Sequence, residues 1–587
     1  MADVRPASNL SPSEIAMRLL REAVPARWKL YALSLVCMVG VAGFTAAFAW
    51  STKLIVNDVF VAGDAVAAYG IAALVVGLAL AKAGSDYANA VVGVVFARSV
   101  SAATQKRVFA AFLDKDVWHF LGTPAAKHMA DVKLYGQAAG KVVVGLANRL
   151  LTDGLTVIAL LAVMIWQDPL MSLVSLILFP AIFLLISTLS RRIKSVARVE
   201  KELTGTLQAL GTESFDGVRT IKSYGLEEKS KARFNAAVDA LEERILSIAK
   251  ATSATMPAME VMGGLVLGGF VVYAAWQTIT VGQSPGEFTA FITAFLLAYQ
   301  PAERVSKLWV DVQKSLAHVQ QMYEILEAPP RRPQGGNAEL AGQPSITFDA
   351  VSFAYSENAP ALHDVSLDIR AGERIAIVGG SGAGKTTLID LVQRFYDPTA
   401  GTIRIGGQDL RDLSEPAMRN AIALIAQDVF LFEGTVRENV RDGRPDAEDA
   451  AVIEAVRRAA LDDVLAADGG IDAQVGPGGA FLSGGQRQRV GIARALLRGA
   501  RVLIFDEATS ALDAANERRI MENLIATQSG ATLLFVTHRA ATLAYVDRVL
   551  FLQEGRLAGF DRHAALSRSN AAYRTLFNLD KTADAAE

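Results

Sequence analysis

Long apolar stretches separated by shorter polar ones dominate the first half of this chain of 587 residues. Six of the apolar stretches are long enough to cross the hydrocarbon core of a bilayer, which takes about 20 mainly apolar residues. They cover residues 30–54, 66–96, 142–165, 170–190, 252–276 and 287–308. The pattern predicts six long transmembrane helices, and the even number places both chain termini on the same side of the membrane.

Two of the connections between these stretches are long and keep a helical pattern of apolar and polar positions. They cover residues 98–141 and 191–250. A helix of about 40 residues extends about 60 Å at 1.5 Å per residue, well beyond the bilayer. We therefore expect the spans to continue as helices into the aqueous phase and to reverse at two turns, near residues 114–124 and 213–220.

Beyond residue 328 the apolar stretches become short. Residues 328–337 are rich in proline and glycine, which is typical of a linker. Strand-like runs then alternate with helical patterns, as in an α/β nucleotide-binding domain, with the runs at residues 346–348, 375–378, 502–505 and 533–536. The predicted organisation is a transmembrane domain at residues 1–328, a linker at 329–345, a nucleotide-binding domain at 346–580 and a tail at 581–587.

Composition and charge placement support a membrane protein. Hydrophobic residues make up 52% of the chain and charged residues 20%, and the net charge of −2 provides no field that would recruit nucleic acid. Lys and Arg are absent from residues 57–64, 166–169 and 277–286, but they are frequent on the opposite flanks of the spans. The positive-inside bias then makes both termini and the second half of the chain cytoplasmic. The single cysteine, Cys37, excludes an intrachain disulfide.

A glycine-rich segment at the end of a strand-like run carries the clearest chemical signal. It fits the phosphate-loop pattern G-x-x-x-x-G-K-[ST] in full and comprises Gly379, Gly380, Ser381, Gly382, Ala383, Gly384, Lys385, Thr386 and Thr387. Glycines let successive backbone N–H groups close around a polyphosphate, and the following helix aims its positive dipole end at the same charge. We expect Lys385 to reach the β- and γ-phosphates and the Thr386 hydroxyl to hold Mg²⁺.

Two further segments narrow the class of nucleotide-binding protein. The apolar run 502–505 delivers Asp506, which suits Mg²⁺, and Glu507, which could polarise an attacking water as a general base. The segment Leu482-Ser-Gly-Gly-Gln486 precedes a helical pattern and forms a second anion-binding helix start. Its members are Ser483, Gly484, Gly485 and Gln486. A single domain does not need two such anion-binding sites to bind one nucleotide.

An LSGGQ segment about 100 residues after a phosphate loop resembles the ATP-binding cassette (ABC) transporter family, and the chain is similar to its exporter branch over nearly its whole length. The resemblance implies that two cassettes pair head to tail, with each ATP between the phosphate loop of one and the LSGGQ of the other. A chain with one cassette and six spans must then pair with a second chain. A complete set of site residues favours an identical partner over a different one.

The same resemblance assigns roles to residues outside the phosphate loop. It implies that Tyr355 stacks on adenine, that Gln427 senses Mg²⁺ and touches the membrane domain, and that His538 contacts the γ-phosphate. Asp513, in Ser510-Ala-Leu-Asp513, would link the two ATP sites. The chain departs from related exporters at Gly476-Pro-Gly-Gly479, where they usually carry Gly-Glu-Arg-Gly, and this puts the usual coupling contact of that glutamate in doubt.

Ionisable residues inside the spans are the candidates for a substrate cavity, because they are costly in a membrane unless they face a cavity or a partner. Lys82 and Asp86 lie four residues apart in the second span, and Glu260 lies in the fifth. The resemblance to the lipid A flippase, in which a basic residue at about this depth binds a substrate phosphate, implies that Lys82 could meet an anionic head group; alternatively, the pair could neutralise itself in a wet cavity. The best likeness is to the bacterial lipid A flippase and its relatives, but Gln300-Pro-Ala-Glu303 replaces basic residues there, which argues against lipid A itself.

The sequence thus predicts an ATP- and Mg²⁺-dependent homodimeric exporter or flippase of the bacterial inner membrane. It would move an amphipathic or lipid-like substrate outward by alternating access, with membrane lipid as its surroundings and no nucleic acid partner. Multidrug, peptide, glycan and glutathione-conjugate export stay open as alternatives. From another class, an ATP-gated channel or regulatory protein of the same fold also remains, although intact Glu507 and His538 favour the exporter.

Overall fold

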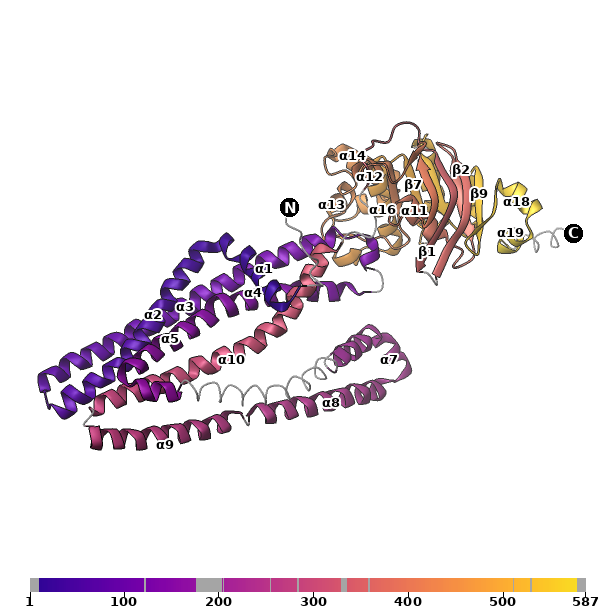
Figure 1. Cartoon of the computed structure of the whole chain (residues 1–587). Coiled ribbons are helices and arrows are strands. Elements are labelled where there is room, and N and C mark those ends of the chain that lie inside the picture. The colour runs from indigo at the N-terminus through magenta and orange to yellow at the C-terminus, as the bar shows by residue number, and fades with distance from the viewer. Residues whose placement is uncertain are drawn as a thin grey trace. The chain divides into compact units, whose positions relative to one another are not determined.

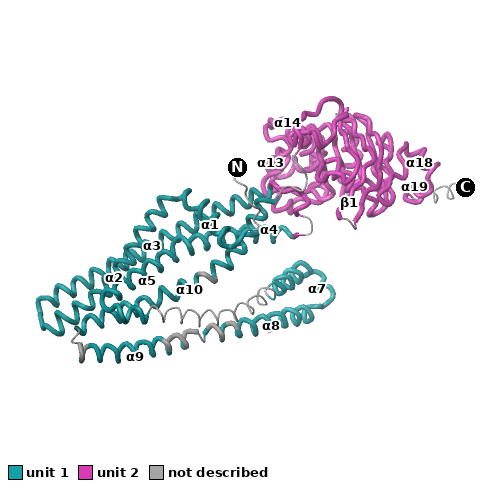
Figure 2. The backbone as a smooth tube through the Cα atoms, viewed as in Figure 1, with its two compact units in different colours: residues 1–113, 124–328 teal, residues 114–123, 329–587 magenta. Residues whose placement is uncertain are grey.

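The computed structural model describes residues 10–120, 123–175, 203, 205–253, 255–281, 284–328, 335–356, 359–509, 511–527 and 530–577. The chain forms two compact units, one of residues 1–113 and 124–328 and the other of residues 114–123 and 329–587 (Figure 2). The second unit therefore includes a short segment that comes from the middle of the helical half of the sequence.

Where the structure describes it, the first unit is built from helices, several of them very long (Figure 1). The helices are α1 (Pro12–Ala23), α2 (Trp28–Leu54), α3 (Ala65–Leu113), α4 (Ala125–Val144), α5 (Leu150–Gln167), α7 (Val218–Tyr224), α8 (Glu227–Ser253), α9 (Thr255–Val281) and α10 (Pro285–Glu327). With 49 residues, α3 is about 70 Å long. It ends at Leu113 and α4 begins at Ala125, so the first reversal lies where the sequence predicts it.

Three described helical segments are long and apolar enough to cross a membrane: Pro12–Val61, Ala65–Leu113 and Ala125–Gln167. They contain the first three predicted spans. The predicted spans 252–276 and 287–308 fall on α9, which holds the shorter apolar segment Gly263–Gln277, and on α10. Most of the predicted span 170–190 lies outside the described residues.

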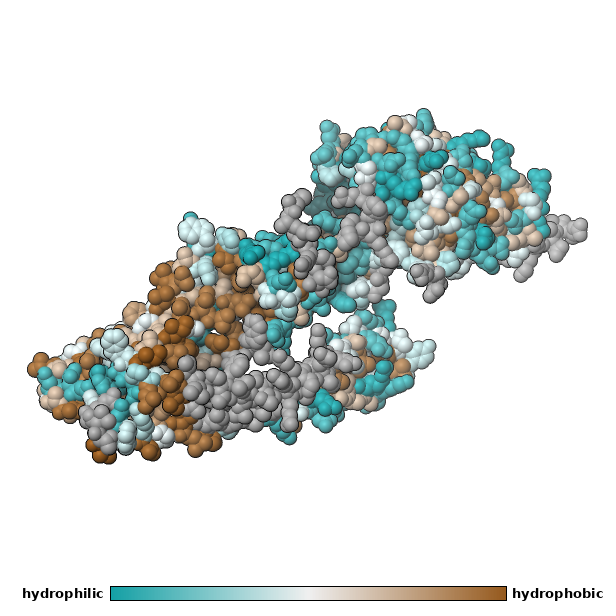
Figure 3. Space-filling model, in the orientation of Figure 1, coloured by the Kyte–Doolittle hydropathy of each residue, from teal (hydrophilic) through white to brown (hydrophobic). Residues whose placement is uncertain are grey.

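The helical unit exposes large apolar side chains on its outer surface. Figure 3 shows hydrophobic surface gathered on this unit. Among the exposed residues are Val36, Leu80, Ile158, Trp166 and Val272. Exposed apolar area of this extent is unfavourable in water and is what a lipid-facing surface requires. The inner faces pack a separate core, in which the ring of Phe270 meets the rings of Phe291 and Phe295 edge to face.

A buried polar cluster joins three helices of this unit. The Asn148 amide donates to Ser34 Oγ at 2.7 Å and to Asn89 Oδ1 at 3.0 Å, and the Asn89 amide donates to Thr152 Oγ1 at 3.1 Å. Ser34 lies on α2, Asn89 on α3 and Thr152 on α5. Asn148 lies in a π-helical turn, Gly145–Arg149, that joins α4 to α5. The wider turn re-aims the Asn148 side chain toward the two neighbouring helices.

Further polar links connect α10 to the bundle. The Arg304 guanidinium donates to both carboxylate oxygens of Asp153 on α5, at distances from 2.7 to 3.3 Å. At the start of α10, Lys53 forms an ion pair with Glu287 at 3.1 Å, and Ser284 donates to Asn57 Oδ1 at 2.5 Å. These last contacts fasten the start of α10 to the end of α2 and to the π-helical turn Ile55–Val61 that follows it.

The second unit contains two sheets. A six-stranded sheet has the order β10-β9-β3-β8-β7-β6, and its strands β9, β3, β8, β7 and β6 are parallel. Its members are β3 (Arg374–Gly379), β6 (Ile422–Ile425), β7 (Val502–Asp506), β8 (Thr532–Val536), β9 (Arg548–Gln553) and β10 (Arg556–Asp561). The predicted runs 375–378, 502–505 and 533–536 fall on β3, β7 and β8.

A second, antiparallel sheet has the order β2-β1-β4-β5. It consists of β1 (Ile346–Ser356), β2 (Ala359–Ile369), β4 (Ala400–Ile405) and β5 (Gln408–Asp409). The run 346–348, which the sequence indicates as one more strand of an alternating α/β domain, begins β1 in this separate sheet. Ile346 and Phe348 alternate inward into a core that also contains Ile377 and Leu388, so this sheet packs against the parallel one.

The helices of the second unit surround these sheets. They are α11 (Lys385–Val392), α12 (Glu415–Ala421), α13 (Val436–Arg441), α14 (Asp449–Arg458), α15 (Asp462–Ala466), α16 (Gly484–Arg498), α17 (Ala514–Thr527), α18 (His563–Ser569) and α19 (Ala571–Leu576). Residues 335–345, predicted as linker, pack against this unit: the Gly336 and Ala338 amides donate to the carbonyls of Arg411 and Asp412. The predicted tail 581–587 lies outside the described residues.

Candidate functional site

The candidate site lies where neighbouring parallel strands end. In the sheet order β3-β8-β7-β6, the phosphate loop (residues 379–387) follows β3, His538 follows β8, Asp506 ends β7 and Gln427 follows β6. Parallel strands present their carboxyl ends at one edge of a sheet, and ligands of open α/β sheets bind there. The topology thus gathers residues that are far apart in the sequence at a single edge.

The phosphate loop has a backbone that only glycine accommodates well. Gly382 and Gly384 have φ of 75° and 96°. A Cβ on Gly384 would also lie 2.7 Å from Leu362 Cδ2 and 2.8 Å from the Ala361 carbonyl oxygen. The left-handed backbone and the close approach of β2 therefore both require glycine at position 384. From there α11 begins at Lys385 and directs its N-terminal N–H groups toward the loop.

Lys385 and the two threonines after it take different positions. The Lys385 ammonium donates to the carbonyl oxygens of Gly379 and Gly380, each at 2.9 Å, and so lies over the loop that it is predicted to serve. The Thr386 side chain is exposed at the mouth of the site, whereas Thr387 is buried. The Thr387 hydroxyl pairs with the Tyr355 hydroxyl at 3.1 Å. Thr386 is thus the hydroxyl that remains accessible to a cation.

Glu507 connects the ends of three strands. Its carboxylate accepts a hydrogen bond from the Gln427 amide at 3.0 Å and lies 3.2 Å from His538 Nε2. The side chain is 18% exposed, and its backbone has φ of 49°, an unusual value for a residue other than glycine. Its N–H is paired with the Val536 carbonyl oxygen at 3.1 Å, which holds this backbone in place. The structure therefore brings together two predicted catalytic residues and the predicted Mg²⁺ sensor.

Negative charge accumulates beside the phosphate loop. Burial raises the pKa of Asp506, and the charge of Glu507 adds to the effect while Lys385 opposes it. Burial, together with the charge of Asp506, raises the pKa of Asp390 on α11 to about 6. Crowded carboxylates of this kind attract a cation. Asp506, the Thr386 hydroxyl and the Gln427 amide oxygen are hard oxygen donors of the sort that Mg²⁺ takes.

The described residues contain no cluster of three His, Cys, Asp or Glu side chains that would hold a metal by itself. A Mg²⁺ ion here would consequently depend on Thr386, Gln427 and Asp506 together with phosphate oxygens of the nucleotide. Mg²⁺ bound in this way would neutralise charge that develops on the β- and γ-phosphates.

The LSGGQ residues form a second cluster, and none of the contacts recorded for the described residues joins them to the phosphate loop. Ser483 caps α16: its hydroxyl accepts from the Gln486 N–H at 3.2 Å, and Gln486 Oε1 accepts from the Ser483 N–H at 2.9 Å. The Gln486 amide also donates to Asp463 at 3.0 Å. Gly485, in the same cluster, packs closely against the segment at Ala511: a Cβ added at Gly485 would lie 3.1 Å from the Ala511 carbonyl oxygen.

Asp513 has a structural contact in the same region. Its carboxylate accepts from the backbone N–H and the side-chain amide of Asn516 at 2.8 and 2.7 Å, at the start of α17. These two hydrogen bonds lower the pKa of Asp513. The predicted role of Asp513 in linking two ATP sites stays a prediction.

The segment Gly476-Pro-Gly-Gly479 forms a tight turn rather than the usual charged segment. Gly476, Gly478 and Gly479 have φ of 71°, 59° and 81°. A Cβ on Gly476 would lie 3.0 Å from the ring of Phe481, which is itself 72% exposed. Phe481 therefore packs against this turn at Gly476 and leaves most of its ring exposed.

Comparison with known proteins places both halves of the chain. Residues 31–301 match the family model of the ABC transporter transmembrane region, and residues 362–510 match the model described as ABC transporter. An uncharacterised ABC transporter ATP-binding protein from Sinorhizobium fredii is 32% identical over 572 residues, which are 97% of this chain and 98% of the relative. This chain belongs to the ABC transporter family.

Further relatives of this ABC transporter indicate its branch. An ATP-dependent lipid A-core flippase of Alkalilimnicola ehrlichii is 34% identical over 564 residues, covering 94% of each chain. A solved bacterial Atm1-family ABC exporter with ATP bound superposes with a TM-score of 0.82 at 25% identity, covering 96% of this chain and 98% of the other. The protein is accordingly a multi-pass membrane exporter driven by ATP, as the sequence predicts.

The predicted substrate-cavity residues of this ABC transporter are less well defined. Lys82 is half-buried on α3 and Asp86 is exposed one turn away, and among the described side chains no ion pair is recorded between them. Glu260 lies on α9, and its side chain is outside what the structure describes. A substrate role for these three residues stays a prediction.

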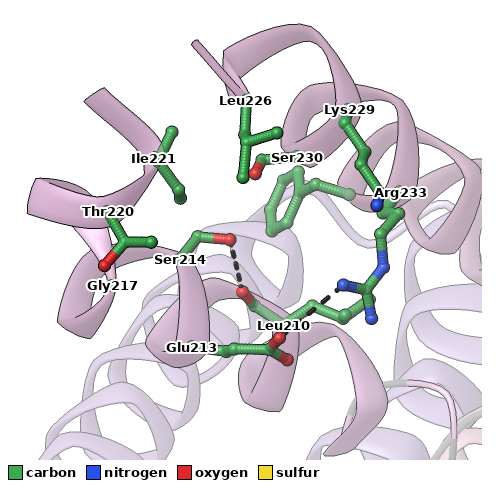
Figure 4. Close-up of a pocket in the computed structure, with 11 residues that line it drawn as sticks. Leu210, Glu213, Ser214, Gly217, Thr220, Ile221, Leu226, Lys229, Ser230 and Arg233 are labelled. Carbon is green, nitrogen blue, oxygen red and sulfur yellow. Dashed lines mark hydrogen bonds and ion pairs between the residues drawn. The ribbon is translucent and has the colours of Figure 1, made fainter. Parts of the chain in front are cut away.

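A pocket of about 310 Å³ lies elsewhere, in the helical unit at the second predicted cytoplasmic turn (Figure 4). Glu213 and Arg233 face each other across it at 3.6 Å, and the Ser214 hydroxyl donates to the Leu210 carbonyl. Its lining comes from residues 210–234, so the pocket belongs to this turn of the transporter and not to the ATP-binding edge.

Sequence reasoning missed several residues that support the ATP site of this transporter. Gln488 is buried on α16, where its side chain accepts from the Ala511 N–H at 3.1 Å and donates to the Gln427 carbonyl at 3.4 Å. It therefore connects the Gln427 segment to the Asp513 segment. Trp118, from the first predicted turn, packs on Tyr355. Neither residue carries a motif signal, because each acts through neighbours that only the fold supplies.

Proposed function

We propose that this ABC transporter works as a homodimer in which each ATP is held between the phosphate loop of one copy and the LSGGQ segment of the other. One observation carries the proposal: the chain has two anion-binding helix N-termini, at α11 and α16, and no contact among the described residues joins them within one copy. A second identical chain would supply each half-site with its complement, in the closed two-fold arrangement common among homodimers.

Within that dimer the residues at the sheet edge divide the work of hydrolysis. Glu507 is the general base that takes a proton from the attacking water, and His538 contacts the γ-phosphate. Gln427 donates to Glu507 through its amide nitrogen, and its amide oxygen would hold Mg²⁺ together with Thr386 and Asp506. Tyr355 provides the ring on which adenine stacks.

Binding of ATP would draw the two cassettes together, and hydrolysis would separate them. The cytoplasmic turns at residues 114–124 and 213–220 would pass this motion to the spans, which open alternately to either side. We propose the domain boundaries that the sequence predicts, with a membrane domain at residues 1–328 and a cassette at residues 346–580. We propose that the membrane is the bacterial inner membrane. Both termini would be cytoplasmic, because Lys and Arg gather on the flanks that continue toward the cassette.

The proposed substrate is amphipathic or lipid-like. Relatives named ATP-dependent lipid A-core flippase, each matching most of this chain, support that class. In the region of Gln300-Pro-Ala-Glu303 the next basic residue, Arg304, is already paired with Asp153, so it offers less charge to a phosphorylated head group. This pairing favours a substrate with fewer anionic groups than lipid A. Lys82, Asp86 and Glu260 are the proposed polar groups of the cavity.

The experiment is reconstitution of the purified chain into lipid vesicles with Mg²⁺ and ATP. We expect ATP-dependent movement of fluorescent phospholipid or of an amphipathic drug across the bilayer, and stimulation of ATP hydrolysis by the transported compound. Glu507→Gln vesicles are the matched control and should show neither. A chain that hydrolyses ATP but passes ions down their gradient would identify a channel, and a chain that stays monomeric without hydrolysis would contradict the homodimer.

A further inference from the structure

Four aromatic rings of the second unit form one cluster around Tyr355. Trp118 lies 6.1 Å from the Tyr355 ring in a tilted arrangement and 5.2 Å from the Tyr396 ring in an edge-to-face one. It also meets Phe353 edge to face at 6.3 Å. These separations and angles are those at which aromatic pairs attract one another.

The four rings come from very different parts of the chain. Phe353 and Tyr355 lie on β1, and Tyr396 follows α11. Trp118 lies in the short helix Val117–Phe120, inside the stretch of sequence that matches the ABC transporter transmembrane region. It nevertheless packs against the core of the second unit. The membrane half of the sequence thus contributes one ring to a cluster in the cassette.

Tyr355 is fixed by the cluster and by the phosphate loop together. Its ring contacts Phe353 at 5.0 Å and Tyr396 at 5.6 Å, while its hydroxyl pairs with Thr387. Burial raises the pKa of the Tyr355 phenol, so the hydroxyl stays protonated and the pair with Thr387 persists at neutral pH. With the hydroxyl end held, the remaining freedom of the ring is a tilt, and the Trp118 ring limits that tilt.

We propose that Trp118 is a positioning residue for the nucleobase of ATP: by holding the Tyr355 ring at a set tilt, it determines how well a purine stacks there. The proposal rests on the proposed function, in which Tyr355 receives adenine. A stacked base depends on a ring that is already oriented, because orienting it during binding costs free energy. The contribution of Trp118 is therefore specific to the base and leaves the triphosphate contacts untouched.

The test compares ligands with and without a base on the full-length chain in lipid nanodiscs. Calorimetric titrations with a nonhydrolysable ATP analogue and with inorganic tripolyphosphate, each with Mg²⁺, give two dissociation constants for every variant. For Trp118→Ala we expect the constant for the ATP analogue to rise about threefold to tenfold while that for tripolyphosphate stays within about twofold, which is the scale of one aromatic contact. Trp118→Phe keeps a ring and should restore most of the affinity.

Val117→Ala is the matched control, because Val117 lies in the same short helix, is 40% exposed and takes part in none of these ring contacts. It should bind both ligands as the unaltered chain does. Equal weakening of both ligands by Trp118→Ala, or unchanged or tighter binding of the ATP analogue, would overturn the proposal. The proposed function would still hold after those results if the unaltered chain hydrolyses ATP and transports its substrate. If the unaltered chain does neither, the proposed function itself is contradicted.

Discussion

At the scale of single residues, Glu507 combines a reactive side chain with an unusual backbone. Its φ of 49° is held by the hydrogen bond from its N–H to β8, and its carboxylate already meets Gln427 and His538. Backbone strain of this kind persists where the surrounding structure determines it, and it is frequent at active sites. These contacts therefore orient the carboxylate.

Glu507→Gln should therefore abolish turnover while preserving binding. The amide keeps the shape of the side chain but cannot take a proton from water, and loss of a general base costs about 10²- to 10⁴-fold in rate. Phosphate release measures the rate, and titration with the nonhydrolysable analogue measures binding. Hydrolysis within tenfold of the unaltered chain would exclude Glu507 as the base.

Asp390 supports a prediction about pH. Its pKa is about 6 in the folded chain against 3.8 for an ordinary Asp, so the folded state binds more protons between these values than the unfolded state does. Stability from this group is therefore complete below about pH 4 and is lost as the pH rises through 6. Asp390→Asn removes the charged form, so it should stabilise the nucleotide-free protein at pH 7.5. We expect a gain of roughly 1–2 kcal/mol, less than the full pKa shift implies, because the carboxyl is partly exposed and solvent screens its charge.

Thermal unfolding of the two proteins at several pH values measures this effect. The gain from Asp390→Asn should shrink steadily as the pH falls below 6 and approach zero only below about pH 4. The same gain at every pH, or a loss at pH 7.5, would show that the Asp390 carboxyl is not destabilised by burial and by Asp506.

At the scale of helices, the π-helical turn Gly145–Arg149 and the polar cluster belong together. Without the extra residue of the turn, the Asn148 amide would not be directed at α2 and α3, and Ser34 and Asn89 would lose a shared partner. Buried polar contacts between membrane helices are worth about 0.5–2 kcal/mol each. The cluster thus sets how α2, α3 and α5 sit against one another.

Asn148→Ala should lower the stability of the helical unit by about 1–2 kcal/mol, since it removes two donated hydrogen bonds from a buried interface. The melting temperature in detergent, followed by circular dichroism, measures the loss. Leu151→Ala is a suitable control, because Leu151 is close in sequence but 37% exposed on the outer surface. The double variant with Asn89→Ala should lose less than the sum of the single changes, and simple additivity would contradict a shared cluster.

The pattern of the sequence predicts helices and strands better than it predicts which other helices and strands they pack against or pair with. The long helices, the parallel strands β3, β7 and β8, and the gathering of Glu507, His538 and the phosphate loop follow from periodicity and motif order. The antiparallel sheet does not, because a strand such as β1 alternates in the same way whichever sheet it joins. Gln488 and Asp390 act through packed neighbours, which leaves no local signal in the sequence.

At the scale of the whole molecule, the alternating access that we propose requires the ends of the spans to separate. The start of α10 is fastened to the end of α2 by the Lys53–Glu287 ion pair and by the hydrogen bond from Ser284 to Asn57. The backbones are close: a Cβ on Gly286 would lie 2.3 Å from Asn57 Oδ1. Opening at this end of the bundle must break these contacts.

A disulfide between cysteines placed at positions 57 and 284 should therefore stop transport. Because Cys37 is the only native cysteine, Cys37→Ser provides a clean background for Asn57→Cys and Ser284→Cys. We expect oxidation to reduce transport in vesicles more than tenfold, while binding of the ATP analogue is retained. A reducing agent should restore transport, and full transport by the oxidised protein would show that this end of the bundle does not open between α2 and α10.

The discontinuous second unit has a consequence for how the protein is made. The ring of Trp118 leaves the ribosome long before Phe353 and Tyr396, the rings against which it packs, so the core of the cassette is covered there by a residue from an earlier part of the chain. A fragment beginning at residue 329 would possess every strand and still leave an aromatic face open to water. Isolated cassettes of this protein should for that reason self-associate during expression, and supplying residues 114–123 as a peptide should keep them in solution.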